Sequence, residues 1–177
     1  NKNNIKSIII DHHEINKPYP KSNIIVNPKK GNGYLNYDYF CATALTYFFL
    51  EILVKKIKSN FKTTYFLIYV LLATVCDVMP LRKINKTIAS NVLKNFKINK
   101  HIVFDSLYKI IGVSKPLEIE DLSYLIGPII NSGGRLGYSN LGVELLTSND
   151  PKIIMNKLNK LINLNNKRKK IEKNIIE

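Results

Sequence analysis

Apolar and polar positions along the chain form two patterns, and these predict a few short strands followed by a series of helices. A β-branched run over residues 5–10 stops abruptly at a polar segment, which is the pattern of a buried strand. A second apolar run over 23–26 predicts another short strand. The segment between the two runs contains prolines that forbid regular structure, so we expect a loop there.

Downstream, apolar residues recur at the three- and four-residue spacing of amphipathic helices. A stretch that begins near Thr63 or Thr64 as a cap and runs to about Val75 is apolar nearly all round, which predicts a buried helix. The other expected helices cover 39–58, 86–96, 102–111, which Gly112 ends, and 118–125.

The last predicted helix begins with Asp150 as N-cap and Pro151 at the first helical position, and it runs to the end of the chain. It carries a strongly basic segment over 165–170, for which a solvated face is the default interpretation. The basic loop 29–33 allows phosphate contact, although a solvated loop is the better interpretation. Because the chain opens without Met and ends in an uncapped helix, we expect a piece of a longer protein.

Composition adds a packed core and a strong positive charge. Apolar residues make up 45% of the 177 residues, which suits one ordinary folded domain and argues against disorder. Twenty-seven Lys and Arg against 13 Asp and Glu give a net charge of +14, which favours a polyanionic partner, most simply nucleic acid. A general drift in composition is the alternative source of this charge, because Lys is abundant throughout the chain.

Cysteine usage and hydropathy indicate a cytoplasmic protein that does not enter a membrane. Cys41 and Cys76 lie far apart, without the spacing of a structural zinc site, and suit a reducing compartment. The most apolar stretch, 65–76, is too short to span a bilayer. No signal-peptide pattern opens the chain.

The candidate chemistry lies where the first strand ends, at Asp11, His12 and His13. Ligands of open α/β sheets bind just past the carboxyl ends of strands, so we expect a metal here; a polar turn is the alternative. Side chains alternate along a strand, so we expect the two histidines to separate and to serve different purposes. One would bind the metal, and the other would meet a phosphate or protonate a leaving group.

Two further positions suggest ligand contacts. Asp77 ends the buried helix, where a carboxylate opposes the helix dipole, so we expect a compensating cation such as a metal; a solvated carboxylate is the alternative. The glycine-rich stretch 127–137 contains Asn131 and Arg135. Glycines that admit a ligand, together with one guanidinium fork, are what a phosphate clamp needs. A flexible turn with a surface Arg is the alternative.

Taken together, these motifs resemble the DHH phosphoesterases and, among them, the RecJ-type single-strand-specific exonucleases. The resemblance covers essentially the whole chain. Stretches 127–136 and 164–172 separate the RecJ type from pyrophosphatases and small-oligonucleotide relatives. The sequence departs from the family pattern at Ala42 and Ala44, where glycines are usual, and at Ile129, where a basic residue is common. The matching stretches are 10–13, 25–28, 40–45, 73–81, 127–136 and 164–172.

This resemblance implies an α/β fold, the C-terminal part of a DHH-type parallel-sheet domain followed by mainly α-helical segments and a long connecting helix. Residues 1–147 would form the partial DHH domain, and 148–177 would start the interdomain helix. The aspartates of the family's first two motifs are expected upstream of this chain, and a substrate-binding domain downstream. The implied roles are metal ligation by His12 and Asp77, orientation of the histidines by Asp11, phosphate contact or proton transfer by His13, and nucleic-acid binding by Asn131 and Arg135.

The function implied is part of a metal-dependent 5′-to-3′ exonuclease for single-stranded DNA, acting in DNA repair and recombination. Two divalent ions, Mn²⁺ or Mg²⁺, would serve the full-length protein, and the isolated chain would be inactive. We expect a monomer, with a single-strand-binding protein or a helicase as further partners in the intact system. Two alternatives stay open: a DHH phosphoesterase for short oligonucleotides or nucleotides, and a non-catalytic scaffold that binds nucleic acid or a partner protein.

Overall fold

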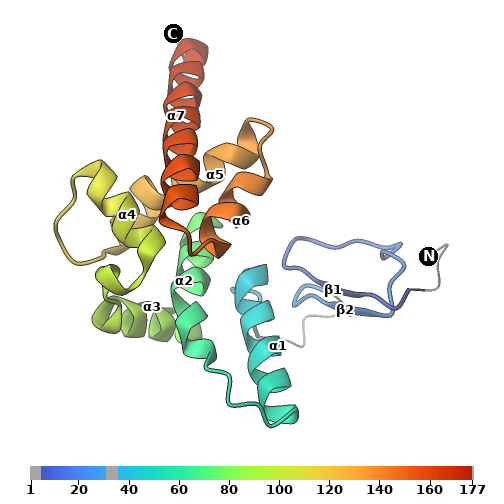
Figure 1. Ribbon diagram of the computed structural model, residues 1–177. Helices are drawn as coiled ribbons and strands as arrows, with labels where there is room; N and C mark the ends of the chain where they lie inside the picture. The colour runs from blue at the N-terminus through green and yellow to red at the C-terminus, as the bar shows by residue number, and fades with distance from the viewer. Residues whose placement is uncertain (1–4, 31–35, 177) are drawn as a thin grey trace. The chain divides into compact units, whose positions relative to one another are not determined.

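The computed structural model describes residues 5–30 and 36–176 and divides into two compact units, Asn1–Lys94 and Asn95–Glu177 (Figure 1). Strands occur in the first unit, and the described part of the second unit is helical. Residues 31–33 of the basic loop predicted at 29–33 lie outside the described residues. Within the described ranges, no helix combines the length and apolar character that a bilayer crossing requires.

The first unit opens with a two-stranded parallel sheet. Strands β1 (Ile8–Ile10) and β2 (Ile24–Val26) pair with Ile8 opposite Ile24, so both predicted strands are confirmed in shorter form. The Asp11 amide donates to the Val26 carbonyl at 3.0 Å, which carries the pairing one step past β1. The prediction of a buried strand is wrong, because Ile8 and Ile24 are 49% and 52% exposed. Two strands of three residues make too small a sheet to cover these side chains.

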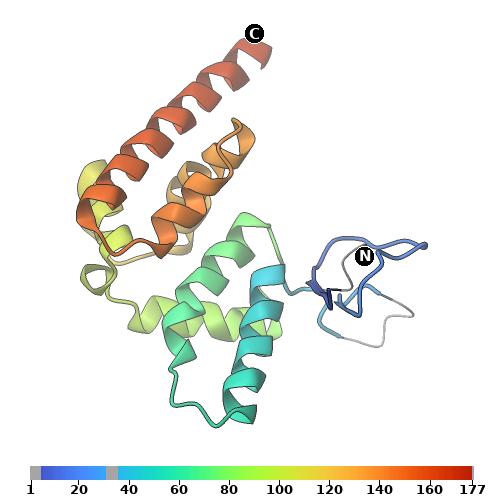
Figure 2. The same ribbon diagram turned by 45° about the vertical axis from the view of Figure 1, so that its right-hand side comes forward.

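Three helices complete the first unit (Figure 2). They are α1 (Ala42–Lys56), α2 (Leu67–Cys76) and α3 (Lys83–Asn95), and α1 packs beside α2. The predicted buried helix is confirmed in α2, whose core side chains include Ile68 and Leu71. No threonine side chain caps α2; the short 3₁₀ helix η1 (Thr63–Phe66) leads into it instead.

The second unit is built around its last helix. Its elements are η2 (Ile98–Lys100), α4 (Ile102–Ile111), the π-helical turn η3 (Asp121–Ile126), α5 (Gly127–Arg135), α6 (Asn140–Thr147) and α7 (Pro151–Ile176). The predicted bounds of α4 are confirmed, and Gly112 ends it in the left-handed conformation with φ 76°. The predicted cap of α7 is confirmed as well, since Asp150 Oδ1 accepts the Lys152 amide at 2.8 Å.

Helix α7 packs against α4, α5 and α6 through one buried stripe. Ile154, Leu158 and Leu161 are fully buried at the spacing of one helix face. The C-terminal part of α7 projects beyond the other helices of the second unit (Figures 1 and 2).

The glycine-rich stretch is not the flexible turn considered above, because residues 127–135 form helix α5. Its glycines allow close packing on α7. A Cβ atom added at Gly133 would lie 2.8 Å from the Tyr138 carbonyl oxygen and 3.1 Å from Leu161 Cδ2. Beside it, the Ser132 hydroxyl lies 3.0 Å from the Leu161 carbonyl oxygen. The small residues therefore let the α5 backbone approach α7.

Candidate metal centre

The end of β1, the start of α1 and the end of α2 converge in the first unit. His12 Nε2 lies 3.7 Å from Asp77 Oδ2, although the two residues are far apart in the sequence. The start of α1 is tied to α2 by Cys41 Sγ and Thr74 Oγ1, which are 3.6 Å apart. The convergence of His12 and Asp77 expected from the motifs is therefore present.

The orientation of His12 is fixed by helix α1. Its Nδ1 accepts the Ala42 amide at 3.0 Å, so His12 caps a helix whose own N-cap residue, Cys41, provides no side-chain bond. Because Nδ1 is the acceptor, the proton of the neutral ring lies on Nε2 and faces Asp77. Metal ligation through Nε2 requires that proton to move to Nδ1, which releases the Ala42 amide.

Asp11 and His13 form a second pair. Asp11 Oδ1 and His13 Nδ1 are 2.7 Å apart, so Nδ1–H donates to the carboxylate and Nε2 remains for a ligand. This hydrogen bond is the main reason why the pKa of Asp11 lies below its usual value. The His13 side chain is 76% exposed, and it is therefore accessible to an incoming substrate.

The two histidine rings lie side by side. Their centroids are 4.5 Å apart with a tilt of 30°, so the expectation that strand alternation separates them is wrong. The reason is that β1 ends at Ile10, after which the strand pleat no longer sets side-chain direction. As a result, the candidate ligand atoms of Asp11, His12 and His13 all lie within 4.8 Å of one another.

This donor set fits a hard divalent cation. Carboxylate oxygens with imidazole nitrogens suit Mn²⁺ or Mg²⁺ better than a metal that prefers thiolates. Two ligand atoms held about 2.1 Å from one ion lie at most about 4.2 Å apart. The separation of 3.7 Å between His12 Nε2 and Asp77 Oδ2 is within that limit.

Two buried asparagines support the site, although the sequence patterns assigned neither of them a role. Asn27 Nδ2 donates to the His13 carbonyl at 2.9 Å and so fixes the residues after β1. Asn85 is 1% exposed and donates to the carbonyls of Tyr39 at 2.7 Å and Pro80 at 3.0 Å. A signal existed for Asn85, because it lies on the same helix face as the buried Ile88.

The turn after Asp77 is strained. The Met79 amide donates to the Thr74 carbonyl at 2.9 Å and the Val78 amide to Val75 at 3.1 Å, which is a Schellman arrangement. Val78 occupies the left-handed position with φ 54°, where glycine is usual, and it is 87% exposed. The end of α1 has the same arrangement, with Lys58 at φ 54°, so this turn describes how the helix ends and is not by itself a sign of function.

The two predicted nucleic-acid contacts lie in the second unit. Asn131 and Arg135 are both exposed on α5, and their spacing of four residues places them on one helix face. Ile129, which stands where the family commonly has a basic residue, is only 4% exposed and belongs to the core. The four residues of the metal centre and these two residues therefore form separate clusters in separate units.

Known proteins resemble this chain along almost its whole length. The single-stranded-DNA-specific exonuclease RecJ of Haemophilus influenzae is 27% identical over 95% of this chain and 31% of its own length. The crystal structure of RecJ from Thermus thermophilus in complex with Mn²⁺ matches 98% of this chain with a TM-score of 0.83 at 22% identity, over 26% of its own chain. A crystal structure of exonuclease RecJ bound to manganese matches 98% with a TM-score of 0.84 at 20% identity, over 44% of its own chain.

These comparisons confirm the resemblance to RecJ-type exonucleases, and the solved structures confirm the predicted α/β fold. No protein-family model matches the chain. The chain spans less than a third of the length of the curated relatives that it matches.

Proposed function

We propose that this chain, which is RecJ-like in sequence and fold, is part of a metal-dependent 5′-to-3′ exonuclease for single-stranded DNA. The observation that carries the proposal is the approach of His12 to Asp77, beside the pair formed by Asp11 and His13. The matching solved structures contain manganese, so their fold is compatible with a divalent cation. Trimming single strands is the step by which such an enzyme would act in DNA repair and recombination.

Each residue of the candidate metal centre has a distinct role in this proposal. His12 Nε2 and Asp77 would hold one Mn²⁺ or Mg²⁺ ion, and a second ion would need ligands beyond these. Asp11 keeps His13 oriented through Nδ1, so that His13 Nε2 can meet a phosphate oxygen or protonate the leaving oxygen. When bound, such ions activate water and stabilise charge on the reacting phosphate.

In the second unit, Asn131 and Arg135 would engage the backbone of the same strand. Both are exposed one helical turn apart, and a guanidinium matches phosphate geometry with two parallel hydrogen bonds. We propose the same boundary as the sequence suggested, with 1–147 in the DHH domain and 148–177 starting a connecting helix. A monomer acting with a single-strand-binding protein or a helicase is the form that we propose.

The test is mutagenesis of the metal centre in a protein of the relatives' length that contains this segment. We expect His12→Ala and Asp77→Ala each to abolish Mn²⁺-dependent hydrolysis of single-stranded DNA and to weaken Mn²⁺ binding measured by electron paramagnetic resonance. Glu14→Gln is the matched control, because this nearby exposed carboxylate pairs with Lys29 instead. Hydrolysis unchanged in both Ala variants would refute the assignment, and a preference for short oligonucleotides would favour the phosphoesterase alternative.

A further inference from the structure

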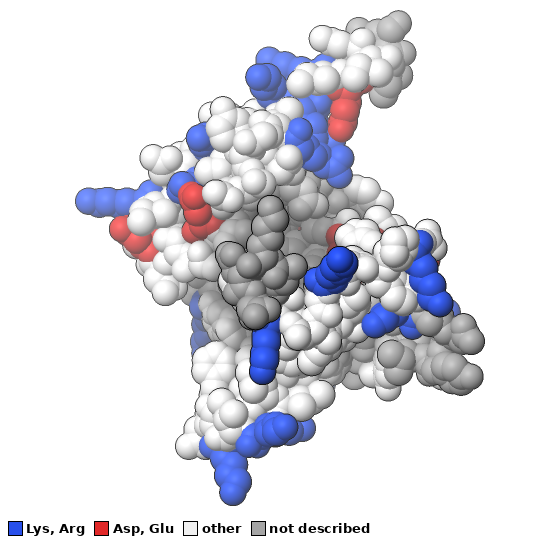
Figure 3. All heavy atoms as spheres, turned by 90° about the vertical axis from the view of Figure 1, so that its right-hand side faces the viewer, with Lys and Arg blue, Asp and Glu red and all other residues white. Residues whose placement is uncertain are grey.

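Helix α7 carries a large excess of positive over negative charge. Its sequence contains eight Lys and Arg residues and one acidic residue, Glu172. Among the charged side chains on the face drawn in Figure 3, Lys and Arg predominate. Lys157 pairs with Glu144 and Arg168 with Glu172, whereas Lys160 and Lys167 form no salt bridge within the described ranges. This surplus favours an anionic partner over a purely solvated face.

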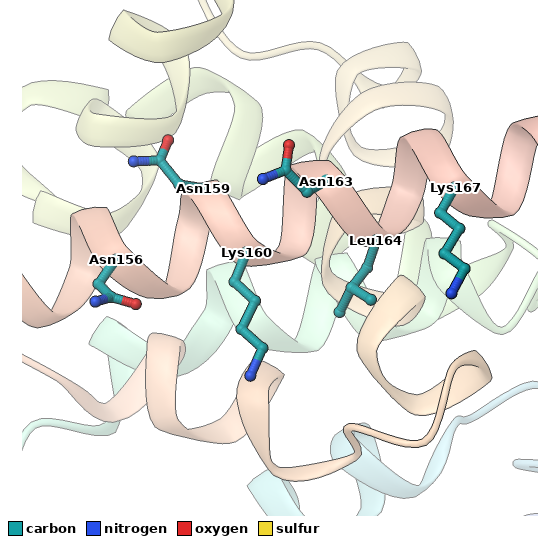
Figure 4. Close-up of a pocket in the computed structure, with 6 residues that line it drawn as sticks. All are labelled: Asn156, Asn159, Lys160, Asn163, Leu164 and Lys167. Atoms are coloured by element: carbon teal, nitrogen blue, oxygen red, sulfur yellow. The ribbon is translucent and has the colours of Figure 1, made fainter.

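A shallow, open groove runs along the exposed side of α7, and its lining residues all belong to this helix (Figure 4). Its volume is about 490 Å³, and its lining contains no carboxylate. The Lys160, Leu164 and Lys167 side chains extend to the same side of the helix in Figure 4. The lining residues are Asn156, Asn159, Lys160, Asn163, Leu164 and Lys167. Ammonium groups and amides in one groove can bind phosphates and the hydrogen-bonding edges of bases.

An aromatic ring adjoins one of these lysines. Lys160 Nζ lies over one face of the Tyr138 ring, 4.4 Å from its centroid, and Tyr138 is 46% exposed. The Tyr138 amide donates to the Gly133 carbonyl at 2.7 Å, so the end of α5 fixes the backbone that carries this ring. An exposed aromatic ring on a fixed backbone, beside a basic groove, is a combination by which proteins bind single strands, because an unpaired base can stack on the ring face that Lys160 does not cover.

We propose that the α7 groove and Tyr138 form a binding surface for single-stranded nucleic acid, with Lys160 and Lys167 on phosphates and Tyr138 against a base. The inference rests on the proposed function and extends it, because it adds a strand contact on α7 to the one proposed on α5. A single strand fits better than a duplex, since the bases of a duplex are not free to stack on a protein ring.

The experiment measures binding of fluorescently labelled oligo(dT) to the 177-residue chain in EDTA, by anisotropy over a series of salt concentrations. The double variant Lys160→Gln/Lys167→Gln should bind more weakly, and its slope of log affinity against log salt should fall by about 1.4, the value for two lost phosphate contacts. Lys109→Gln on α4 is the matched control, because Lys109 pairs with Asp105 outside the groove, and its slope should stay unchanged.

Tyr138→Ala tests the stacking contact. Affinity should fall about 5- to 150-fold without a change in the salt slope, because no charge is removed. Tyr138→Phe should restore binding, and melting temperatures of both variants identify any loss that comes from unfolding. A folded Tyr138→Ala chain that binds as tightly as the unmodified one would overturn the role of the ring.

Two other outcomes would overturn the proposal as a whole. One is a double variant whose affinity and salt slope match those of the unmodified chain. The other is equal affinity for a duplex of the same length, which indicates a basic surface without preference for single strands. Because binding is measured without divalent metal, either outcome leaves the metal-centre proposal standing, and failure of the manganese experiment leaves this binding test unaffected.

Discussion

At the scale of single residues, His12 both caps a helix and takes part in the candidate metal centre. Its Nδ1 accepts the first amide of α1, and its Nε2 faces Asp77. The ring is therefore part of the fold even before any ligand binds. Asp77 differs, because its carboxylate is 42% exposed and lies 3.7 Å from this ring.

This difference predicts that, in the absence of metal, substitutions of His12 and Asp77 change the stability of the fold by unequal amounts. His12→Ala should lower the free energy of unfolding by about 1 kcal/mol, the usual value of a lost helix cap. Asp77→Ala should change it by no more than about 0.5 kcal/mol, as for other exposed positions. Urea denaturation in EDTA, followed by circular dichroism, measures both. Equal losses in the two variants would show that the bond from Ala42 does not stabilise α1.

The residue scale also shows what sequence patterns can reveal. Asp11, His12, His13 and Asp77 were identified because acids and imidazoles at the ends of apolar runs are conspicuous. The roles of Asn27 and Asn85 were not foreseen, because their partners are backbone carbonyls and amides whose positions only the folded chain defines. The close approach of the two histidine rings was missed for the same reason, since it depends on where β1 ends.

At the scale of elements, α5 shows how glycine can be misinterpreted. Local chemistry favours a turn at several glycines, but the packing of α5 against α7 overrides that preference. Gly133 is buried against the Tyr138 backbone, while Gly134 is exposed with open space where a Cβ atom would lie.

The two glycines make a matched pair for a test. Gly133→Ala should destabilise the second unit by about 1–3 kcal/mol, because a methyl group there forces the backbone apart. Gly134→Ala should be stabilising by about 0.5–1 kcal/mol, since alanine favours the helix and meets no neighbour. Thermal unfolding of both variants measures the difference. A melting temperature of Gly133→Ala equal to or above that of Gly134→Ala would contradict the packing role of Gly133.

The π-helical turn η3 depends on one buried carboxylate. Asp121 is 7% exposed and accepts hydrogen bonds from Tyr108 Oη and the Glu118 amide, each at 2.9 Å, with Lys115 Nζ at 3.2 Å. Burial acts to raise the pKa of Asp121, but the bonds from Glu118, Tyr108 and Lys115 together outweigh it and leave the pKa lowered.

The lowered pKa of Asp121 determines the direction in which stability changes with pH. The ionised Asp121 stabilises the folded chain above the unfolded pKa of about 3.9, and this contribution is lost as pH falls through the lower folded pKa. Asp121→Asn should therefore flatten the loss of stability below about pH 4. The measurement is urea unfolding over a pH series, with Asp105→Asn on α4 as control. An unchanged acid profile in Asp121→Asn would contradict the hydrogen-bonded role.

At the scale of the whole molecule, the first unit contains the candidate metal centre found among the described residues, and the second unit contains the basic surface on α7. The strand and helix patterns located most elements within a few residues. The division after Lys94 had no local signal, because it depends on which helices pack together and not on a proline- or glycine-rich linker. The domain boundary predicted at 147/148 stays a prediction.

The small number of ligands predicts the behaviour of the 177-residue chain alone. Two histidines and two aspartates cannot surround two ions, and in-line displacement by two metals needs both ions about 3.5–4 Å apart. The chain should bind Mn²⁺ weakly and hydrolyse single-stranded DNA little or not at all. A nuclease assay with purified chain and excess Mn²⁺ tests this, and robust hydrolysis would show that four candidate ligands suffice.

The two-stranded sheet has a practical consequence for such experiments. Within the described ranges each strand has a single neighbour, and Ile8 and Ile24 are about half exposed. Open strand edges with apolar side chains are templates for pairing with another chain. Concentrated samples of the 177-residue chain should therefore self-associate through β1 and β2. A charged substitution such as Ile8→Lys would be the first step towards a sample that stays monodisperse.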